Sequence, residues 1–201
     1  PRHQFLYHFK LYILTHMKHL KTNISIFSFV LVAVFTFTAC SDEVKDPPKP
    51  NEGELITTVE LTFTNTASPS EVSIFRFADP DGEGGNTPSE TDTIALAANS
   101  TYALTVRFLD ESKPDVEDIT TEVLEEAAEH RVCYTSTAGT TVVITDQDAN
   151  GLDLGLAATI TTTNADKGTF QVSLKHQPDV KDGSCDVGET DVEVSFVLEV
   201  E

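Results

Sequence analysis

Apolar and polar side chains alternate along several segments of this chain. The clearest case is residues 192–200, where every second residue is apolar and those between are mostly polar or acidic. The same period of two recurs in residues 55–63, 102–108 and 170–174. A period of two with one polar face predicts β-strands that pack against a core on one side only. Shorter apolar runs, which also predict strands, occupy residues 72–77, 93–96, 131–135, 141–145 and 157–163.

Turn-forming residues separate these segments. They lie at 79–82, 138–139, 150–151 and 166–168, and each group contains a glycine. About nine short strands at this spacing predict an all-β fold, an Ig-like β-sandwich of two sheets. We therefore expect residues 55–201 to form a single domain with its own hydrophobic core.

One segment departs from the strand pattern. Residues 118–130 have apolar residues at helical spacing, and glutamates stand at positions 122, 125, 126 and 129. Asp118 is suited to cap the N-terminus of a helix, with Glu122 in its first turn. We predict one short helix here, lying across an end or an edge of the sandwich.

The first 39 residues have the features of an export signal. From Met17, a short basic stretch is followed by an apolar run at residues 24–37. Residues 17–39 therefore predict a secretory signal peptide, and an uncleaved anchor helix is the alternative. Residues 1–16 precede this initiator, and we expect them to be upstream sequence included by an early start.

Small residues precede a cysteine at the end of this signal. Residues 38–40, Thr-Ala-Cys, resemble the lipobox of bacterial lipoproteins, in which the cysteine is acylated and becomes the first mature residue. The acidic pair at 42–43 resembles the export signal of Bacteroidetes lipoproteins. We expect a lipid anchor at Cys40 in the outer membrane, facing the cell surface. Residues 40–54 are rich in acid and proline and predict an extended tether.

The charge of the chain narrows the range of its partners. The chain has 201 residues, with 13 Lys and Arg against 33 Asp and Glu, and a formal net charge of −20. All 33 acidic residues follow position 41, and only nine of the basic residues do. Such a surface repels a phosphate backbone, which excludes a conventional nucleic-acid binder. It also disfavours docking on anionic headgroups through a basic patch.

Several short motifs resemble those of a known group of proteins. They occur at residues 99–102, 108–112, 117–120, 129–130, 174–178 and 188–192. Together they resemble small acidic surface lipoproteins of flavobacteria and other Bacteroidetes, often labelled "type 1 periplasmic binding fold superfamily". The resemblance implies no particular activity, but it implies a TonB-dependent outer-membrane receptor as a partner. The strand pattern and the chain length predict a sandwich and not the two-lobed α/β fold that this label names.

Two acidic loops are candidates for calcium binding. The first loop offers Asp79, Asp81 and Glu83. The second loop offers Asp146, Asp148 and Asn150. Their spacing before Gly151 matches the first half of an EF-hand loop, but Ala157 stands where the bidentate glutamate belongs. An ordinary acidic turn between strands is the alternative for both loops.

The mature chain contains only two histidines, His130 and His176. His176 falls on the apolar phase of its predicted strand, where a polar ring needs a partner. His130 ends the predicted helix, with Glu126 four residues earlier on the same face. If the fold brings the two imidazoles together, Glu126 or Glu129 would complete a site suited to zinc or copper. The alternative is a half-buried core His176 and a His130 stabilised by the helix dipole.

Two cysteines remain once Cys40 carries lipid. In an oxidising compartment we expect Cys133 and Cys185 to form a disulfide, and two free thiols are the alternative. The sequence has no Gly-x-Ser-x-Gly motif, no phosphate-binding loop and no His-Glu-x-x-His zinc motif. Cys133 lies in a strand-like run, which is a poor position for an exposed thiolate. We therefore do not expect an enzyme.

These features favour a binding function at the cell surface. We expect a lipid-anchored module that is accessory to a TonB-dependent uptake system and able to hold a divalent metal such as zinc, copper or calcium. The acidic surface would attract cationic ligands. The alternative, from a different class, is a structural or adhesive β-sandwich without a small-molecule ligand.

Overall fold

The computed structural model describes residues 55–82 and 85–201. They form two β-sheets and one short helix, α2 (Thr120–Glu125), which confirms the prediction of a mostly β, two-sheet fold. The predicted export signal, the lipidation site at Cys40, the tether over residues 40–54 and Glu83 all lie outside the described residues. Within the described ranges, no helix is both long and apolar enough to cross a membrane.

The larger sheet, sheet A, has seven strands in the order β3-β2-β1-β5-β9-β8, and β6 pairs with β5 beside this path. Every pair of neighbours in it is antiparallel. Its strands are β1 (Thr58–Asn65), β2 (Val72–Ala78), β3 (Glu90–Thr91), β5 (Thr101–Asp110), β6 (Glu117–Asp118), β8 (Thr140–Ile144) and β9 (Ala157–Thr162). The two strands beyond the predicted number, β3 and β6, have two residues each.

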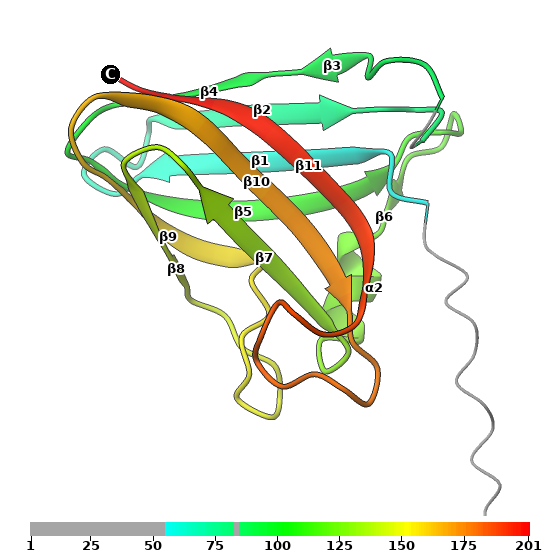
Figure 1. Cartoon of the computed structure of the whole chain (residues 1–201). Helices are drawn as coiled ribbons and strands as arrows, with labels where there is room; N and C mark the ends of the chain where they lie inside the picture. The colour runs from blue at the N-terminus through cyan, green and yellow to red at the C-terminus, as the bar shows by residue number, and fades with distance from the viewer. Residues whose placement is uncertain (1–54, 83–84) are drawn as a thin grey trace, which may run out of the picture. The chain divides into compact units, whose positions relative to one another are not determined.

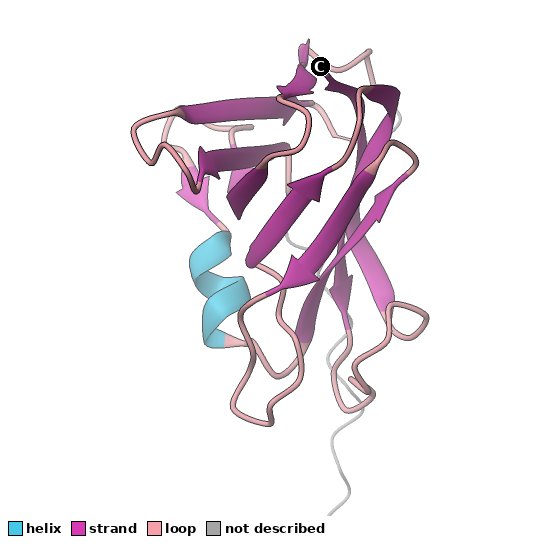
Figure 2. Cartoon of the chain, turned by 90° about the vertical axis from the view of Figure 1, so that its left-hand side faces the viewer, coloured by secondary structure: helices cyan, strands magenta, loops and turns pink. Residues whose placement is uncertain are grey.

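The smaller sheet, sheet B, has four strands in the order β4-β11-β10-β7. They are β4 (Thr93–Leu96), β7 (His130–Ser136), β10 (Asp166–His176) and β11 (Glu189–Val200). The β4–β11 pair is parallel and the other pairs are antiparallel. Figure 1 shows β7, β10 and β11 crossing in front of sheet A. In Figure 2, which is turned by 90°, α2 lies to one side of the strands, near the loops at their lower end.

The core lies between the two sheets. Alternate residues of each strand point inward, as the period of two predicts. Sheet A contributes residues such as Leu61, Phe63, Leu104, Phe108 and Ile160, and sheet B contributes Val132, Phe170, Leu174, Phe196 and Leu198. Phe63 packs edge-on against Phe75, Tyr102 and Phe170, with ring centroids 5.7–6.2 Å apart. Aromatic and branched side chains from both layers therefore form one continuous core.

The helix is shorter than the predicted segment 118–130. Ile119 and not Asp118 takes the N-cap position, without a side-chain cap bond. Asp118 pairs with Leu109 as part of β6, and its Oδ1 accepts a bond from the backbone N–H of Thr120 at 3.2 Å. The glutamates at 122, 125, 126 and 129 stand three or four residues apart, where like charges repel on a helix surface. A long helix is therefore unfavourable here, and only six residues are helical.

The turn predicted at residues 166–168 was also wrong, because these residues begin strand β10. Gly168 serves a different purpose there. A Cβ at this position would lie 2.6 Å from Oγ1 of Thr137, so the glycine allows residues 137–138 to pass close to the strand.

Candidate metal site

His130 and His176 lie side by side at one end of the core. His130 begins β7 and His176 ends β10, and the two are direct partners across this antiparallel pair. They continue the inward-facing rows of their strands, beyond the buried pair Val132 and Leu174. Their rings stack with centroids 4.8 Å apart and planes 18° apart. In Figure 1 this is the end where the arrowhead of β10 reaches α2.

The position of His130 differs from the predicted one. It is the first residue of β7 and not the end of a helix, and only 3% of it is exposed. Its Nδ1 lies 3.2 Å from the carbonyl oxygen of Glu126. A carbonyl oxygen can only accept, so Nδ1 carries the proton and donates, and the lone pair of Nε2 is left for a ligand. A backbone bond at one ring nitrogen commonly orients a metal-binding histidine.

Burial lowers the pKa of the His130 imidazole, because desolvation disfavours the charged ring. The bond to the Glu126 carbonyl and the charge of Asp191 act in the opposite direction, and the neighbouring His176 lowers the pKa further. Asp191 stands where the register of β10 and β11 skips a residue. The lowered pKa favours the neutral ring, which is the form that ligates a metal.

Two glutamates lie beside the histidine pair. The ligand atoms of Glu126, His130 and His176 all lie within 4.8 Å of one another. Oε2 of Glu129 lies 3.8 Å from Nε2 of His176. Tetrahedral zinc, with bonds of about 2.0–2.1 Å, holds its ligand atoms about 3.3 Å apart. Both glutamates are exposed, so their side chains can rotate toward an ion, and the two imidazole rings would also shift to bring the ligand atoms to about 3.3 Å.

The second calcium candidate uses its carboxylates for the fold. Asp146 Oδ1 accepts a bond from the backbone of Gly155 at 2.8 Å. Asp148 Oδ1 accepts bonds from the backbones of Asn150 and Leu152. Its other oxygen accepts a bond from Nζ of Lys181 at 2.8 Å, and this bond is the main reason why the pKa of Asp148 is lowered. The loop therefore forms an acidic turn in which Oδ1 of Asp146 and both carboxylate oxygens of Asp148 are already bonded.

The first calcium candidate, the loop with Asp79 and Asp81, is held by hydrogen bonds within the loop itself. Asp81 Oδ2 accepts bonds from the backbone and the side chain of Asn86 at 2.8 and 2.7 Å. These bonds lower the pKa of Asp81, whereas burial and the charge of Asp81 raise the pKa of Asp79. Apart from Glu83, which is not described, the loop brings no third metal-binding side chain to these two.

Cys133 and Cys185 are joined by a disulfide in the structure, with their Cα atoms 6.1 Å apart. The bond connects β7 to the loop between β10 and β11, across a sequence separation of 52 residues. Cys133 is buried on the strand, and Cys185 is exposed on the loop. The disulfide therefore fastens a surface loop to the strand that begins with His130.

Sequence reasoning missed two buried polar residues near the histidines. Gln177 is fully buried, and the side chain of Lys181 is only 3% exposed. Lys181 pairs with Asp148, whose side chain is fully buried. A single lysine in an acidic loop is expected to be solvated, so no feature of the sequence marks Lys181 as buried.

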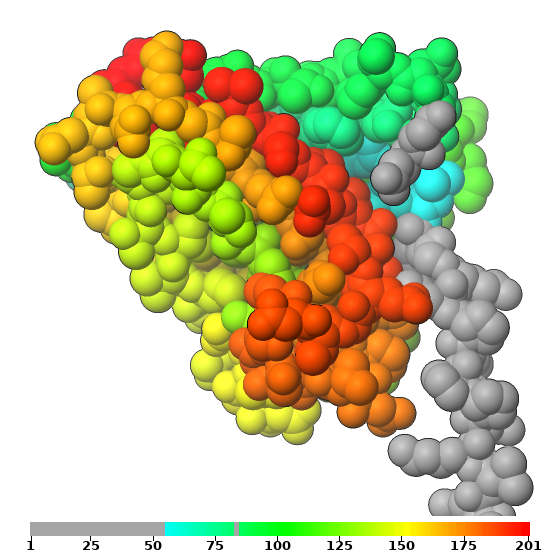
Figure 3. Space-filling model, viewed as in Figure 1, coloured from blue at the N-terminus to red at the C-terminus, as the bar shows by residue number. Residues whose placement is uncertain are grey.

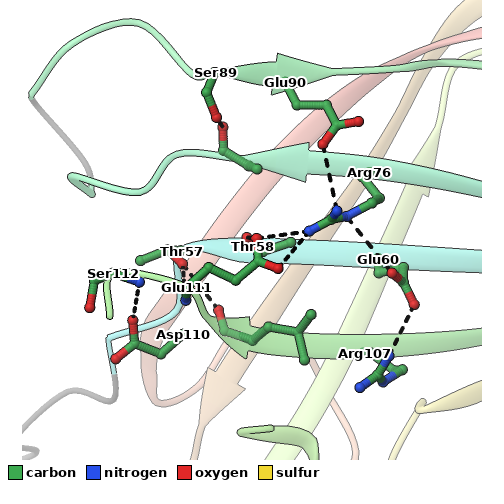
Figure 4. A network of polar contacts seen from close by, with 12 residues as sticks. Thr57, Thr58, Glu60, Arg76, Ser89, Glu90, Arg107, Asp110, Glu111 and Ser112 are labelled. Atoms are coloured by element: carbon green, nitrogen blue, oxygen red, sulfur yellow. Dashed lines mark hydrogen bonds and ion pairs between the residues drawn. The ribbon is translucent and has the colours of Figure 1, made fainter. Parts of the chain in front are cut away.

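The outer face of sheet A carries a second charged cluster (Figure 4). Glu60 of β1 lies between Arg76 of β2 and Arg107 of β5, which are its partners on the two neighbouring strands. Arg76 also contacts both carboxylate oxygens of Glu111 at 2.8 Å, and Arg107 contacts Asp118 at 2.9 Å. We call these five residues the ionic ladder. Both arginines are paired with carboxylates, so the ladder joins strands and offers no obvious anion site.

Comparison with known proteins identifies no family for this chain. No family model matches the chain, and no match is found among curated proteins or among solved structures. The function must therefore be argued from the geometry of the site.

Proposed function

We propose that this protein is a binding domain for a divalent transition metal, zinc or copper, and not an enzyme. The observation that carries the proposal is the stacked pair of His130 and His176 with Glu126 within reach. Two imidazoles at the end of a hydrophobic core lose hydration and need partners there. A metal ion is the partner that two imidazole nitrogens and a carboxylate can share.

The types of ligand select the metal. Two imidazole nitrogens and one carboxylate favour zinc or copper, whereas calcium takes about six to eight oxygen ligands. A fourth position would be filled by water or by Glu129, whose carboxylate lies near His176. Exposed glutamates let an ion enter from solvent, and an open coordination position suits a site that exchanges its ion.

We place this domain at the outer face of the outer membrane, held by a lipid on Cys40. The lipobox-like residues 38–40 and the acidic pair at 42–43 support this placement. The resemblance to Bacteroidetes surface lipoproteins supports an accessory role beside a TonB-dependent receptor. The excess of acidic residues after position 41 would also raise the local concentration of cations around the site.

Calorimetric titration of zinc and of copper into the metal-free protein tests the site. Wild type should bind with a micromolar or lower Kd, and a free ion concentration 100 times the Kd should stabilise the fold by about 2.7 kcal/mol. Glu126→Gln should weaken binding about tenfold or more. Glu122→Gln is the matched control, because Glu122 lies on α2, whose C-cap is Glu126, and outside the cluster.

Two results would end the metal proposal. One is the absence of binding by folded wild-type protein. The other is an equal affinity in wild type and in the His130→Ala/His176→Ala variant, which would place the ion elsewhere.

The lipid anchor has its own test. Cells that express the protein should incorporate a palmitate analogue into wild type and not into Cys40→Ala. Protease added to intact cells should remove the domain from wild type. Membrane attachment of Cys40→Ala, without label in either form, would contradict the anchor.

A further inference from the structure

The loop between β10 and β11, residues 177–188, lies against the segment that carries the proposed ligands. We call this loop the strap. The backbone N–H of Gln177 donates to the carbonyl oxygen of Glu129 at 2.6 Å, and Nζ of Lys181 donates to that of Ala127 at 2.8 Å. Both acceptors lie between Glu126 and His130 in the chain. The strap therefore holds the backbone from which the proposed ligands project.

Lys181 ties the strap to a third segment. Its ammonium donates to Asp148 at 2.8 Å, and both side chains are almost completely buried, at 3% and 0% exposure. The same ammonium donates to the carbonyl oxygen of Ala127, so one buried charge holds together the strap, the acidic turn at 146–151 and the segment that follows α2. Figure 3 shows the strap, in orange, beside the yellow atoms of residues near 150.

The disulfide closes the strap onto β7. Cys185 of the strap is bonded to Cys133, which stands three residues after His130 on the same strand. Inside the strap, Nε2 of Gln177 donates to the carbonyl oxygens of Ser184 and Val187 at 3.0 and 2.9 Å. These bonds link the start of the strap to the part near its other end. The disulfide at Cys185 and the contacts of Gln177 and Lys181 therefore belong to one connected loop.

The disulfide can be reached from solvent. Cys185 is exposed, and both cysteines line a pocket of about 360 Å³ between β7 and β8. Its other walls come from Arg131, Tyr134, Val142, Val143, Ile144 and Asp153. A pocket of this size admits a small thiol. Exposed disulfides are in general the more easily reduced and the more often regulatory ones.

We propose that the Cys133–Cys185 disulfide controls the metal site, so that the oxidised protein holds the ion and reduction releases it. This inference rests on the proposed metal-binding function. A dithiol reductant supplies two electrons and two protons: the S–S bond breaks, two cysteine thiols form, and the dithiol closes to its own disulfide. The freed strap then no longer holds Lys181 and Gln177 against the segment from Glu126 to His130.

Coupling of this kind acts in both directions. If reduction weakens zinc binding by a given factor, bound zinc must make the disulfide harder to reduce by the same factor. We expect a factor of at least ten, because a ligand shell that loses its support commonly loses that much affinity. Zinc should therefore shift the reduction midpoint of the disulfide in a dithiothreitol series.

The closing experiment compares zinc affinity in the oxidised and the reduced protein by calorimetry, with circular dichroism to verify that both are folded. A second variant, Lys181→Met, removes the anchor of the strap and keeps the disulfide. Its matched control is Lys175→Met, since Lys175 is a partly buried lysine of β10 whose Nζ donates to Oγ1 of Thr190, outside the strap. Reduction and Lys181→Met should each weaken zinc binding at least tenfold, and Lys175→Met should leave it unchanged.

A metal-free readout separates the two proposals. Nuclear Overhauser contacts between the rings of His130 and His176 should be present in the oxidised protein and weakened on reduction. Zinc binding of equal strength in oxidised wild type, reduced wild type and Lys181→Met would overturn the control by the disulfide and leave the metal site standing. If the oxidised protein binds no zinc, the metal site itself is wrong, and the control of metal binding is wrong with it.

Discussion

The ionic ladder and the strap both contain ion pairs. The pairs of the ladder are exposed and share partners, whereas the pair of the strap is buried and single. In the ladder, Glu60 has two arginine partners and each arginine has a second carboxylate, and the arginine side chains are 30% and 49% exposed. In the strap, Lys181 has one carboxylate partner, Asp148, and the pair is buried. Water and spare partners can replace a lost ladder contact, whereas nothing in the described structure replaces Lys181.

This difference suggests how stability is distributed. The strands of sheet A are already joined by continuous backbone hydrogen bonds, so the exposed ion pairs of the ionic ladder add little to their stability. The loops around the histidines have few backbone pairings and depend on single contacts. We therefore expect single substitutions to have large effects at the strap and small effects at the ladder.

The largest effect is expected from removal of the disulfide. In the chain-entropy model, a loop closed across 52 residues contributes about 4 kcal/mol. Cys133→Ala/Cys185→Ala should lower the free energy of unfolding by about that amount in urea denaturation at pH 7. A loss below about 1 kcal/mol would show that the strap is held without its covalent end.

The buried pair should come next. Lys181→Met leaves the carboxylate of Asp148 buried without its cation, and we expect a loss of about 3 kcal/mol. The variant Lys181→Met/Asp148→Leu removes both charges and should regain most of that loss. If the double variant is no more stable than the single one, the uncompensated charge is not the cause.

An intermediate effect should appear as a dependence on pH. Burial lowers the folded-state pKa of His130 below the ordinary value of 6.5. Below pH 6.5 the unfolded chain therefore binds a proton before the folded protein does, and stability falls as the pH falls. In the presence of a chelator, wild type should lose stability between pH 7.5 and 5.5, as measured by urea denaturation. His130→Leu should show a flatter profile, and an identical slope would contradict the burial of this ring.

The smallest effect is expected at the ladder. Glu60→Gln leaves Arg76 paired with Glu111 and Arg107 paired with Asp118. Thermal and urea unfolding should show a loss of about 1 kcal/mol or less, reduced further by added salt. A loss as large as that of Lys181→Met would mean that the comparison between the two clusters is wrong.

The strands could be predicted from the sequence because their signal is local. A period of two places Leu61 and Phe63 of β1, and Phe170 and Leu174 of β10, on the inward face without knowledge of the partner strand. The same alternation predicted that His176 faces inward. The short strands β3 and β6 escaped prediction, because two residues carry no period.

The site could be predicted only in part, because its geometry depends on distant contacts. Between the end of the helix and the start of β7 at His130, the backbone accepts hydrogen bonds from Gln177 and Lys181. These two residues are about 50 residues away in the chain. Whether two histidines are register partners is likewise a property of strand pairing. Composition singled out His130 and His176 as the only imidazoles after position 40, and only the fold could show that they stack.

The place of β11 in sheet B has a consequence for the time course of folding. This strand, the last of the described chain, lies between β10 and β4, and its partner Thr93 is about 100 residues earlier. Sheet B cannot be completed until residues 189–200 are available, because β11 joins β4 to β10, and contacts of such high sequence separation form slowly. A chain that emerges from its N-terminus would keep the β11-facing edges of β4 and β10 unpaired until then. We expect the protein to stay unfolded through most of its emergence, a state that is suited to export and exposed to aggregation and proteolysis.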